Sequence, residues 1–271
     1  MDLGPLRAAI GAAGGVPADL AEAVLALVRP AVELAVVEHD DEENPAVVAD
    51  DDEEDPAVVA DDDEEDPAVV ADDDEGQLAG VYGGLPVGDA WPEFEGEPLV
   101  LVARLDCAVL AGLLGPAWTL PAGGSLLCFN DRRHRDGAGA CRVVHVPDGA
   151  PTVEAPEGAQ VIPALPLGAW PGLSLPVLMA AELAEWRSRD LPGVADALDA
   201  LRPVVPYAPH QVLGWLDDSY YPSLTGVRPL LQLEGEEGTA WGECVRIAFV
   251  LPEEDLAAGR LDRVRVVYET A

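Results

Sequence analysis

Three short apolar runs follow one another in the middle of the chain: EPLVLVARL at 97–105, GSLLCFND at 124–131 and CRVVHVP at 141–147. Each is long enough for a strand, and each is bounded by Gly, Pro, Asn or Asp residues that favour turns. Val, Leu and Phe dominate these runs, which is typical of strands buried on at least one face. The three runs therefore predict a β-rich unit in this part of the chain.

A similar succession returns near the C-terminus. It reads RPLLQLEGE at 228–236, CVRIAFVLP at 244–252 and DRVRVVYET at 262–270. An aromatic residue followed by proline precedes each set, Trp91-Pro92 in the first and Tyr221-Pro222 in the second. The order of the elements matches although few side chains are identical, which favours an internal duplication. We predict an α+β fold in which two similar β-rich halves share one core, with flanking helices and a disordered acidic insert.

Helical patterns flank the predicted strands. Two helices are expected at 5–13 and 17–28, before a strand at 31–37, and two more at 174–189 and 193–202. The patterns divide one domain of residues 1–271 into successive segments: N-terminal helices and the first strand (1–34), an acidic repeat insert (35–78), a first β-rich half (79–150), a helical connection (151–209) and a second β-rich half (210–271).

Four units of 11 residues lie in register within the insert. They read AVVEHDDEENP at 35–45, AVVADDDEEDP at 46–56 and again at 57–67, and AVVADDDEGQL at 68–78. Proline recurs once per unit and breaks any helix, while the acid runs repel one another and bury nothing. We therefore expect an extended, disordered loop. It is either a calcium site, a site for a basic protein, a solubilising segment, or a tolerated expansion of the gene; the last is favoured because surface loops accept insertions.

Composition excludes several classes of function. The chain has 51 acids and 15 bases in 271 residues, a formal net charge of −36, which disfavours nucleic acid as a partner. Its longest apolar stretch, Val24 to Val37, is interrupted by Arg29, Pro30 and Glu33, so no membrane span is predicted. With no secretory signal at its start, we expect a cytoplasmic protein whose cysteines are reduced.

The Cys and His residues do not form a familiar metal motif. Cys128, His134, Cys141 and His145 are spaced too widely for structural zinc, which usually needs tight pairs of ligands. We interpret them as core cysteines and surface histidines, and predict no metal and no cofactor. No nucleophile elbow, Cys–His motif or phosphate-binding loop is present either, so no catalytic residue is predicted.

One group of polar and aromatic residues interrupts the apolar segments of the second half. It consists of His210, Gln211, Gln232, Trp241, Glu243 and Arg246. One interpretation is a small binding cleft, with apolar contact from Trp241, charge from Glu243 and Arg246, and a titratable group in His210. The other interpretation, which we favour, is structural: these side chains link loops, fill the core or pair with local acids.

Several stretches together resemble the YwqG-like family, a bacterial group of unknown function. They are RPAVEL (29–34), GGLP (83–86), Trp91-Pro92, EPLVLVARLD (97–106), LPAGGSLLCFND (120–131), HQVLGW (210–215), RPLLQLE (228–234) and AWGECVRIAF (240–249). The last motif has Glu243 where the family usually has Asp, and the loop before GGLP is normally short. The resemblance implies two related β-rich halves and no established activity, while toxin genes near some members suggest an immunity-like role.

Two functional hypotheses follow. The first is a non-enzymatic protein-binding module with a basic partner, because the acidic surface would favour fast association with one. The alternative is a small-molecule binder or an unrecognised enzyme that uses a cleft near His210 and Trp241.

Overall fold

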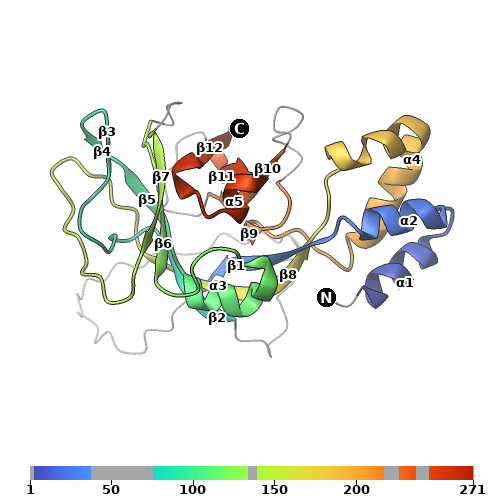
Figure 1. Cartoon of the computed structure of the whole chain (residues 1–271), viewed down its shortest axis with the longest axis horizontal. Coiled ribbons are helices and arrows are strands. Elements are labelled where there is room, and N and C mark those ends of the chain that lie inside the picture. The colour runs from blue at the N-terminus through green and yellow to red at the C-terminus, as the bar shows by residue number, and fades with distance from the viewer. Residues whose placement is uncertain (1–2, 38–75, 134–138, 217–225, 236–243, 271) are drawn as a thin grey trace, which may run out of the picture.

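The computed structural model describes residues 3–37, 76–133, 139–216, 226–235 and 244–270, which form one large antiparallel sheet with helices around it (Figure 1). The strands are β1 Arg29–Val36, β2 Gln77–Tyr82, β3 Glu93–Phe94, β4 Glu97–Pro98, β5 Val100–Asp106, β6 Ser125–Asn130, β7 Cys141–Val146, β8 Leu165–Ser174, β9 His210–Leu213, β10 Val227–Glu234, β11 Cys244–Pro252 and β12 Arg265–Thr270. The helices are α1 Gly4–Ala13, α2 Ala18–Leu25, α3 Cys107–Leu114, η1 Gly115–Ala117, η2 Ala181–Leu183, α4 Ala184–Leu201, α5 Glu253–Ala257 and η4 Leu261–Arg263.

The large sheet has two arms that meet at the β1–β8 pair. Its strand order is β12-β11-β10-β9-β1-β8-β2-β5-β6-β7. Outward from β8 the chain adds β2, β5, β6 and β7, and outward from β1 it adds β9, β10, β11 and β12. We call these the first arm and the second arm. The small β3–β4 hairpin lies apart from this sheet.

The sheet curves until it is nearly closed and barrel-like. Its edge strands β7 and β12 contact one another, and two side-chain bonds cross the seam. Tyr268 Oη donates to Asn130 Oδ1 at 2.6 Å, and Cys141 Sγ donates to the Val264 carbonyl at 3.5 Å. The main core fills the inside, with residues such as Val102 and Leu105 from one arm and Leu231 and Phe249 from the other.

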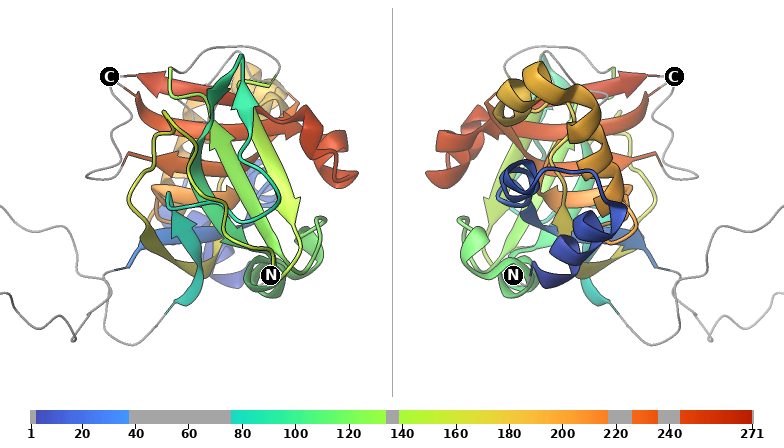
Figure 2. Two further views of the ribbon diagram at one scale, coloured as in Figure 1. Left: turned by 90° about the vertical axis from the view of Figure 1, so that its left-hand side faces the viewer. Right: turned by 90° about the vertical axis from the view of Figure 1, so that its right-hand side faces the viewer.

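A helical layer covers part of the outer face, the face turned away from that core. Helices α1, α2 and α4 pack together around a second apolar cluster that includes Leu6, Leu20, Val194 and Trp215. Figure 2 shows these helices in front of the sheet when the molecule is viewed from their side. The helical layer therefore lies against the second arm and the end of β8, where the functional side chains predicted from the sequence are found.

The six strands predicted from the two repeated successions are confirmed. They are β5, β6 and β7 in the first arm and β10, β11 and β12 in the second. Counted from the β1–β8 pair, the matching strands take the same places in the two arms. The α+β mixture agrees with a fold that is mostly sheet, and the duplication stays a prediction.

Residues 151–209 differ from the predicted helical connection. Residues Leu165–Ser174 form β8, which pairs with both β1 and β2, and the helix expected over 174–189 begins at Ala184 after a turn of 3₁₀ helix. Asp190 has φ −153°, which breaks α4 just before Pro192. A helix that was not predicted, α3, follows β5 because Asp106 caps it by accepting bonds from the Ala108 and Val109 amides.

The predicted acidic insert at 35–78 joins β1 to β2. Residues 38–75 lie outside the described residues, whereas its two ends belong to strands that both pair with β8. Val37 continues this pairing by donating to the Pro166 carbonyl at 3.0 Å. Among the helices of the described segments, none combines the length and hydropathy that crossing a bilayer requires.

Candidate functional site

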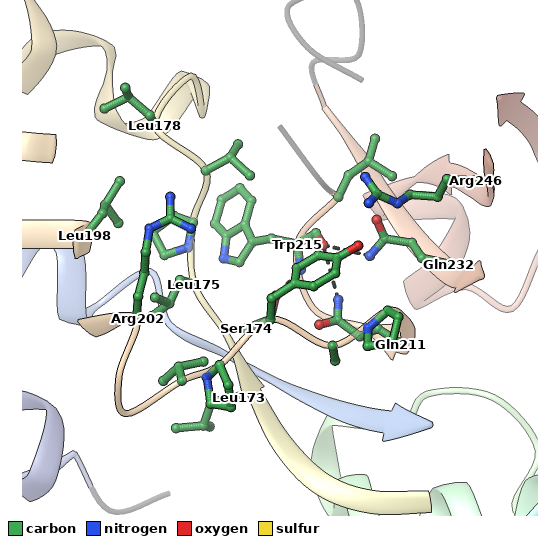
Figure 3. Close-up of a pocket in the computed structure, with 18 residues that line it drawn as sticks. Leu173, Ser174, Leu175, Leu178, Leu198, Arg202, Gln211, Trp215, Gln232 and Arg246 are labelled. Atoms are coloured by element: carbon green, nitrogen blue, oxygen red, sulfur yellow. Dashed lines mark hydrogen bonds between the residues drawn. The ribbon is translucent and has the colours of Figure 1, made fainter. Parts of the chain in front are cut away.

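A pocket of about 250 Å³ lies between the helical layer and the outer face of the second arm. We call it the interlayer pocket. It is lined by residues 173–178, Leu198, Arg202, residues 205–209, Gln211, Trp215, Leu216, Gln232 and Arg246. Most of the lining is apolar, and the polar side chains come mainly from the sheet wall (Figure 3).

Three of the residues predicted from the sequence meet in this pocket. Gln211, Gln232 and Arg246 lie on the adjacent strands β9, β10 and β11. Successive side chains of a strand point to opposite faces, and the neighbours Leu231, Leu233 and Ile247 enter the main core. The alternation therefore directs all three polar side chains to the outer face.

The two glutamines hold the turn that follows β9. Gln211 Nε2 donates to the carbonyls of Leu213 at 2.9 Å and Trp215 at 3.2 Å, and Gln232 Nε2 donates to the Trp215 carbonyl at 2.9 Å (Figure 3). Ser174 Oγ accepts from the Trp215 amide at 2.9 Å. The turn needs this support because Leu213 has φ 60°, a left-handed conformation that costs energy in a residue with a side chain.

Trp215 connects the sheet to the helical layer. Its indole Nε1 donates to the Leu27 carbonyl at 2.7 Å, and the Arg29 guanidinium lies 3.4 Å from the ring centroid. Arg29 also approaches Glu182, with 3.7 Å between Nη2 and Oε1. The tryptophan thus forms a wall of the pocket and links the sheet to the helical layer.

The charge of Arg246 is neutralised locally. Its Nε donates to Glu234 Oε1 at 3.0 Å, and its Nη1 donates to Glu269 Oε2 at 3.0 Å. Tyr207 Oη also bonds to Glu234, and the Tyr207 ring lies 5.4 Å from the guanidinium carbon. The guanidinium of Arg246 is thus shared between two carboxylates at this corner of the pocket.

His210 does not line the pocket. It precedes Gln211 on β9, so its ring lies on the opposite face and is almost fully buried. Its Nδ1 accepts from the Glu234 amide at 3.1 Å, and its ring meets Tyr82 edge to face, with 6.1 Å between the centroids. The cleft predicted near His210 thus forms on the other side of the strand. Trp241 and Glu243 lie outside the described residues.

The buried cysteines are poor nucleophiles. Burial raises the pKa of Cys107 and of Cys141 to about 11, and burial also raises that of Cys128. All three thiols therefore stay protonated at neutral pH. His145 Nε2 bonds to the Gly123 carbonyl at 2.7 Å, and His134 lies outside the described residues. Within the described segments, no three His, Cys, Asp or Glu side chains come together as they would around a metal ion.

Sequence reasoning missed Arg202 and Tyr207 as lining residues. Both belong to the segment that leads from the end of α4 to β9, where no periodic pattern marks which side chains turn inward. Trp215, which forms a wall of the pocket and bonds to Leu27, was not among the predicted site residues either. The HQVLGW stretch could have indicated that Trp215 lines the pocket, since it places Gln211 and Trp215 close together in the chain.

Comparison with known proteins identifies a family but no activity. No curated protein matches the chain. One family model matches residues 78–269, which span β2 to β12 and most of the interlayer pocket. The chain therefore belongs to the family described as "Domain of unknown function (DUF1963)".

Proposed function

We propose that this chain is a non-enzymatic protein-binding module whose basic partner places an apolar side chain in the interlayer pocket. The observation that carries the proposal is a rim of exposed apolar residues. Tyr207 lines the pocket and is 57% exposed, and Met179 and Val204 adjoin the lining residues Leu178 and Val205. Exposed apolar side chains that gather at a pocket are typical of protein interaction sites.

The polar groups of the pocket support binding rather than chemistry. The amides of Gln211 and Gln232 hold the Trp215 turn, and Arg246 is engaged by two carboxylates. Groups that are committed to such bonds stabilise the walls of a pocket and leave apolar contact as the main source of affinity. A volume of about 250 Å³ suits one large side chain better than a drug-sized ligand, for which pockets are usually larger.

The charge of the chain favours a basic partner. With 51 acids against 15 bases, it would attract a basic protein over long distances and speed association at low ionic strength. An immunity-like role, in which the chain neutralises a basic protein, fits this balance. The support here is electrostatic, and it is separate from the apolar rim that would determine how tightly the partner holds.

Paired variants test the proposal. The tagged chain is purified from its own cell type at low and at high salt, and stoichiometric companions are identified by native mass spectrometry. Val204→Asp adds a charge next to the lining residue Val205, whereas Val161→Asp adds the same charge at a residue of similar exposure, 44% against 41%, that does not line the interlayer pocket. We expect a basic partner that is lost with Val204→Asp, is retained with Val161→Asp, and dissociates at high salt. Equal retention by both variants would contradict the proposal.

A small-molecule binder or an unrecognised enzyme remains the second candidate. It is supported by the convergence on one pocket of Gln211, Gln232 and Arg246, three residues of the group that the sequence offered as a binding cleft. The same mass spectrum tests it, because a retained small molecule without a protein companion would support this function. Ala208→Trp, which fills the pocket from the loop after α4, should then remove the molecule.

We also infer three finer properties from the sequence. Within its family the chain is a YwqG-like member, it is a bacterial protein, and it acts in the cytoplasm. The matching places of β5, β6 and β7 and of β10, β11 and β12 support an origin of the two arms by duplication.

A further inference from the structure

A second pocket lies on the outer face of the first arm, where no helix covers the sheet. We call it the loop pocket; its volume is about 470 Å³. Its floor is formed by strands β6 and β7, and its walls by the loops that precede β3 and follow β7. It is lined by residues 87–90, Pro92, Leu127, Phe129 and residues 144–151.

The walls of the loop pocket are held in place before any ligand arrives. The Gly88 amide donates to the Pro151 carbonyl at 2.8 Å, and the Val153 amide donates to the Pro86 carbonyl at 2.9 Å. Between these bonds, Val87 and Thr152 form an antiparallel bridge. Backbone bonds of this kind fix the two loops to one another, so the concave shape costs little further ordering when a ligand binds.

The floor is apolar and continuous with a packed cluster. Leu127, Phe129 and Val146 are buried there, and they pack with Leu99 and Leu101. Val144 contributes the more exposed part of the floor. A hydrocarbon body of a ligand would therefore find apolar surface on several sides.

Two carboxylates stand at the rim without a cation. Asp89 and Asp148 are exposed and line the loop pocket, one from each of its two loops, and neither forms an ion pair or hydrogen bond with another described residue. Among the described residues, no arginine lines this pocket. His145 is engaged through Nε2 by the Gly123 carbonyl. Within the described part of the chain, the rim therefore carries two carboxylates without an ion pair above an apolar floor.

We propose that the loop pocket binds a small organic cation, an aromatic or aliphatic body that ends in an ammonium group. The body contacts Phe129 and Val144, and the ammonium group is attracted by the rim carboxylates of Asp89 and Asp148. A neutral or anionic analogue of the same shape gains the apolar contact but loses the attraction. This site is separate from the interlayer pocket, and the proposal does not depend on the function assigned to that pocket.

Calorimetry and ligand-observed NMR on the full chain test the proposal with three probes of similar shape. These are 2-phenylethylamine, the neutral 2-phenylethanol and the anionic 3-phenylpropanoate. We expect the amine to bind at one site and the other two at least tenfold more weakly. The double variant Asp89→Asn/Asp148→Asn should weaken amine binding about tenfold, as expected for the loss of two exposed ion pairs, and leave the alcohol unchanged.

A charge-matched control separates the site from the general acidity of the chain. Asp196→Asn/Glu254→Gln removes two exposed acids that line neither pocket, and exposed charges outside a site are largely screened at physiological salt. This control should leave amine binding unchanged. Val144→Arg places the chain's own cation in the pocket and should abolish binding of the amine, with folding checked by circular dichroism. Absence of saturable amine binding up to about 10 mM, or equal effects of the two double variants, would overturn the proposal.

Discussion

The two pockets lie on the outer faces of two arms of one sheet, yet they differ in whether their charged side chains are paired within the described chain. In the interlayer pocket, Arg246 is shared between Glu234 and Glu269, and the polar amides hold a turn. In the loop pocket, Asp89 and Asp148 have no partner among the described residues. The paired groups of the interlayer pocket stabilise the folded chain. The carboxylates of the loop pocket make no such contact, so they can attract a cationic ligand.

The coverage of each arm explains this difference. A helical layer packs on the second arm, so polar groups at that junction are drawn out of water and must find partners within the chain. The loop pocket on the outer face of the first arm is lined by loops and strands alone among the described residues, and the carboxylates at its rim stay in water, where an unpaired charge costs little. Substitutions in the interlayer pocket should therefore affect stability strongly, and those in the loop pocket weakly.

The largest effect is expected from Trp215→Ala. The indole is buried, bonds to Leu27 and contacts Arg29, so its removal leaves a cavity between the sheet and the helical layer. Loss of a buried tryptophan typically lowers the free energy of unfolding by about 3–5 kcal/mol. Urea denaturation measures the loss, and hydrogen exchange should show α1 and α2 losing protection first. Trp91→Ala, in the part of the chain that forms the first arm, should destabilise the chain without a selective loss of protection in α1 and α2. The same pattern of hydrogen exchange in both variants would contradict the role of Trp215 as the link between sheet and helical layer.

A smaller loss is expected from Gln211→Leu. The substitution removes the donor that serves two carbonyls of a buried turn, and an unsatisfied buried acceptor costs about 1–3 kcal/mol. Asp148→Asn is the counterpart in the loop pocket and should change the free energy of unfolding by no more than about 0.5 kcal/mol. Thermal and urea unfolding compare the two. If Asp148→Asn lowered the free energy of unfolding as much as Gln211→Leu, the two pockets would not differ in their contribution to stability.

The strands that the sequence predicted are those whose side chains alone favour strand. The runs of Val, Leu, Ile and Phe in β5, β10 and β11 need no help from neighbours to be recognised. Strand β8 was not predicted because LPLGAWPGLS contains Pro166, Pro171 and two glycines, which usually mark loops. Its conformation depends on β1 and β2, which pair with it on both sides, and partners more than 80 residues away along the chain leave no local signal.

The candidate site, like the strands, was predictable only in part. Polar residues that interrupt apolar strands indicated Gln211, Gln232 and Arg246, and strand alternation brings them to one face. His210 was grouped with them as another polar residue in an apolar segment, although as the neighbour of Gln211 on a strand it points to the other face. Nothing in the sequence indicated the loop pocket, because its walls are two loops far apart in the chain that backbone bonds join.

The junction between the arms allows a test of the acidic insert. Both β1 and β2 pair with β8, and Leu34 and Gln77 lie opposite the same residue, Ala169, so the ends of the insert are close. Removing 42–74, three repeat units, leaves six residues between Val37 and Gln77, which is enough to cross one strand. The shorter loop should raise the free energy of unfolding by about 1–2 kcal/mol through its lower closure entropy. Failure of the shortened chain to fold would give the repeats a structural role.

The smallest effect is expected at Glu33, which lies on β1 between the two arms. Its carboxyl group lies across Gly172 on the outer face, and burial raises its pKa above the ordinary value of 4.5. A raised pKa means that the charged form is less stable in the folded chain than in the unfolded one, so the cost is present above the raised pKa. Glu33→Gln should therefore stabilise the chain slightly at pH 7, and the gain should disappear below pH 4.5, where both states are protonated. Urea denaturation of both chains across this pH range measures the gain. A gain that is constant with pH would assign it to packing instead of charge, and Glu22→Gln, at an exposed glutamate paired with Arg7, should show the opposite sign.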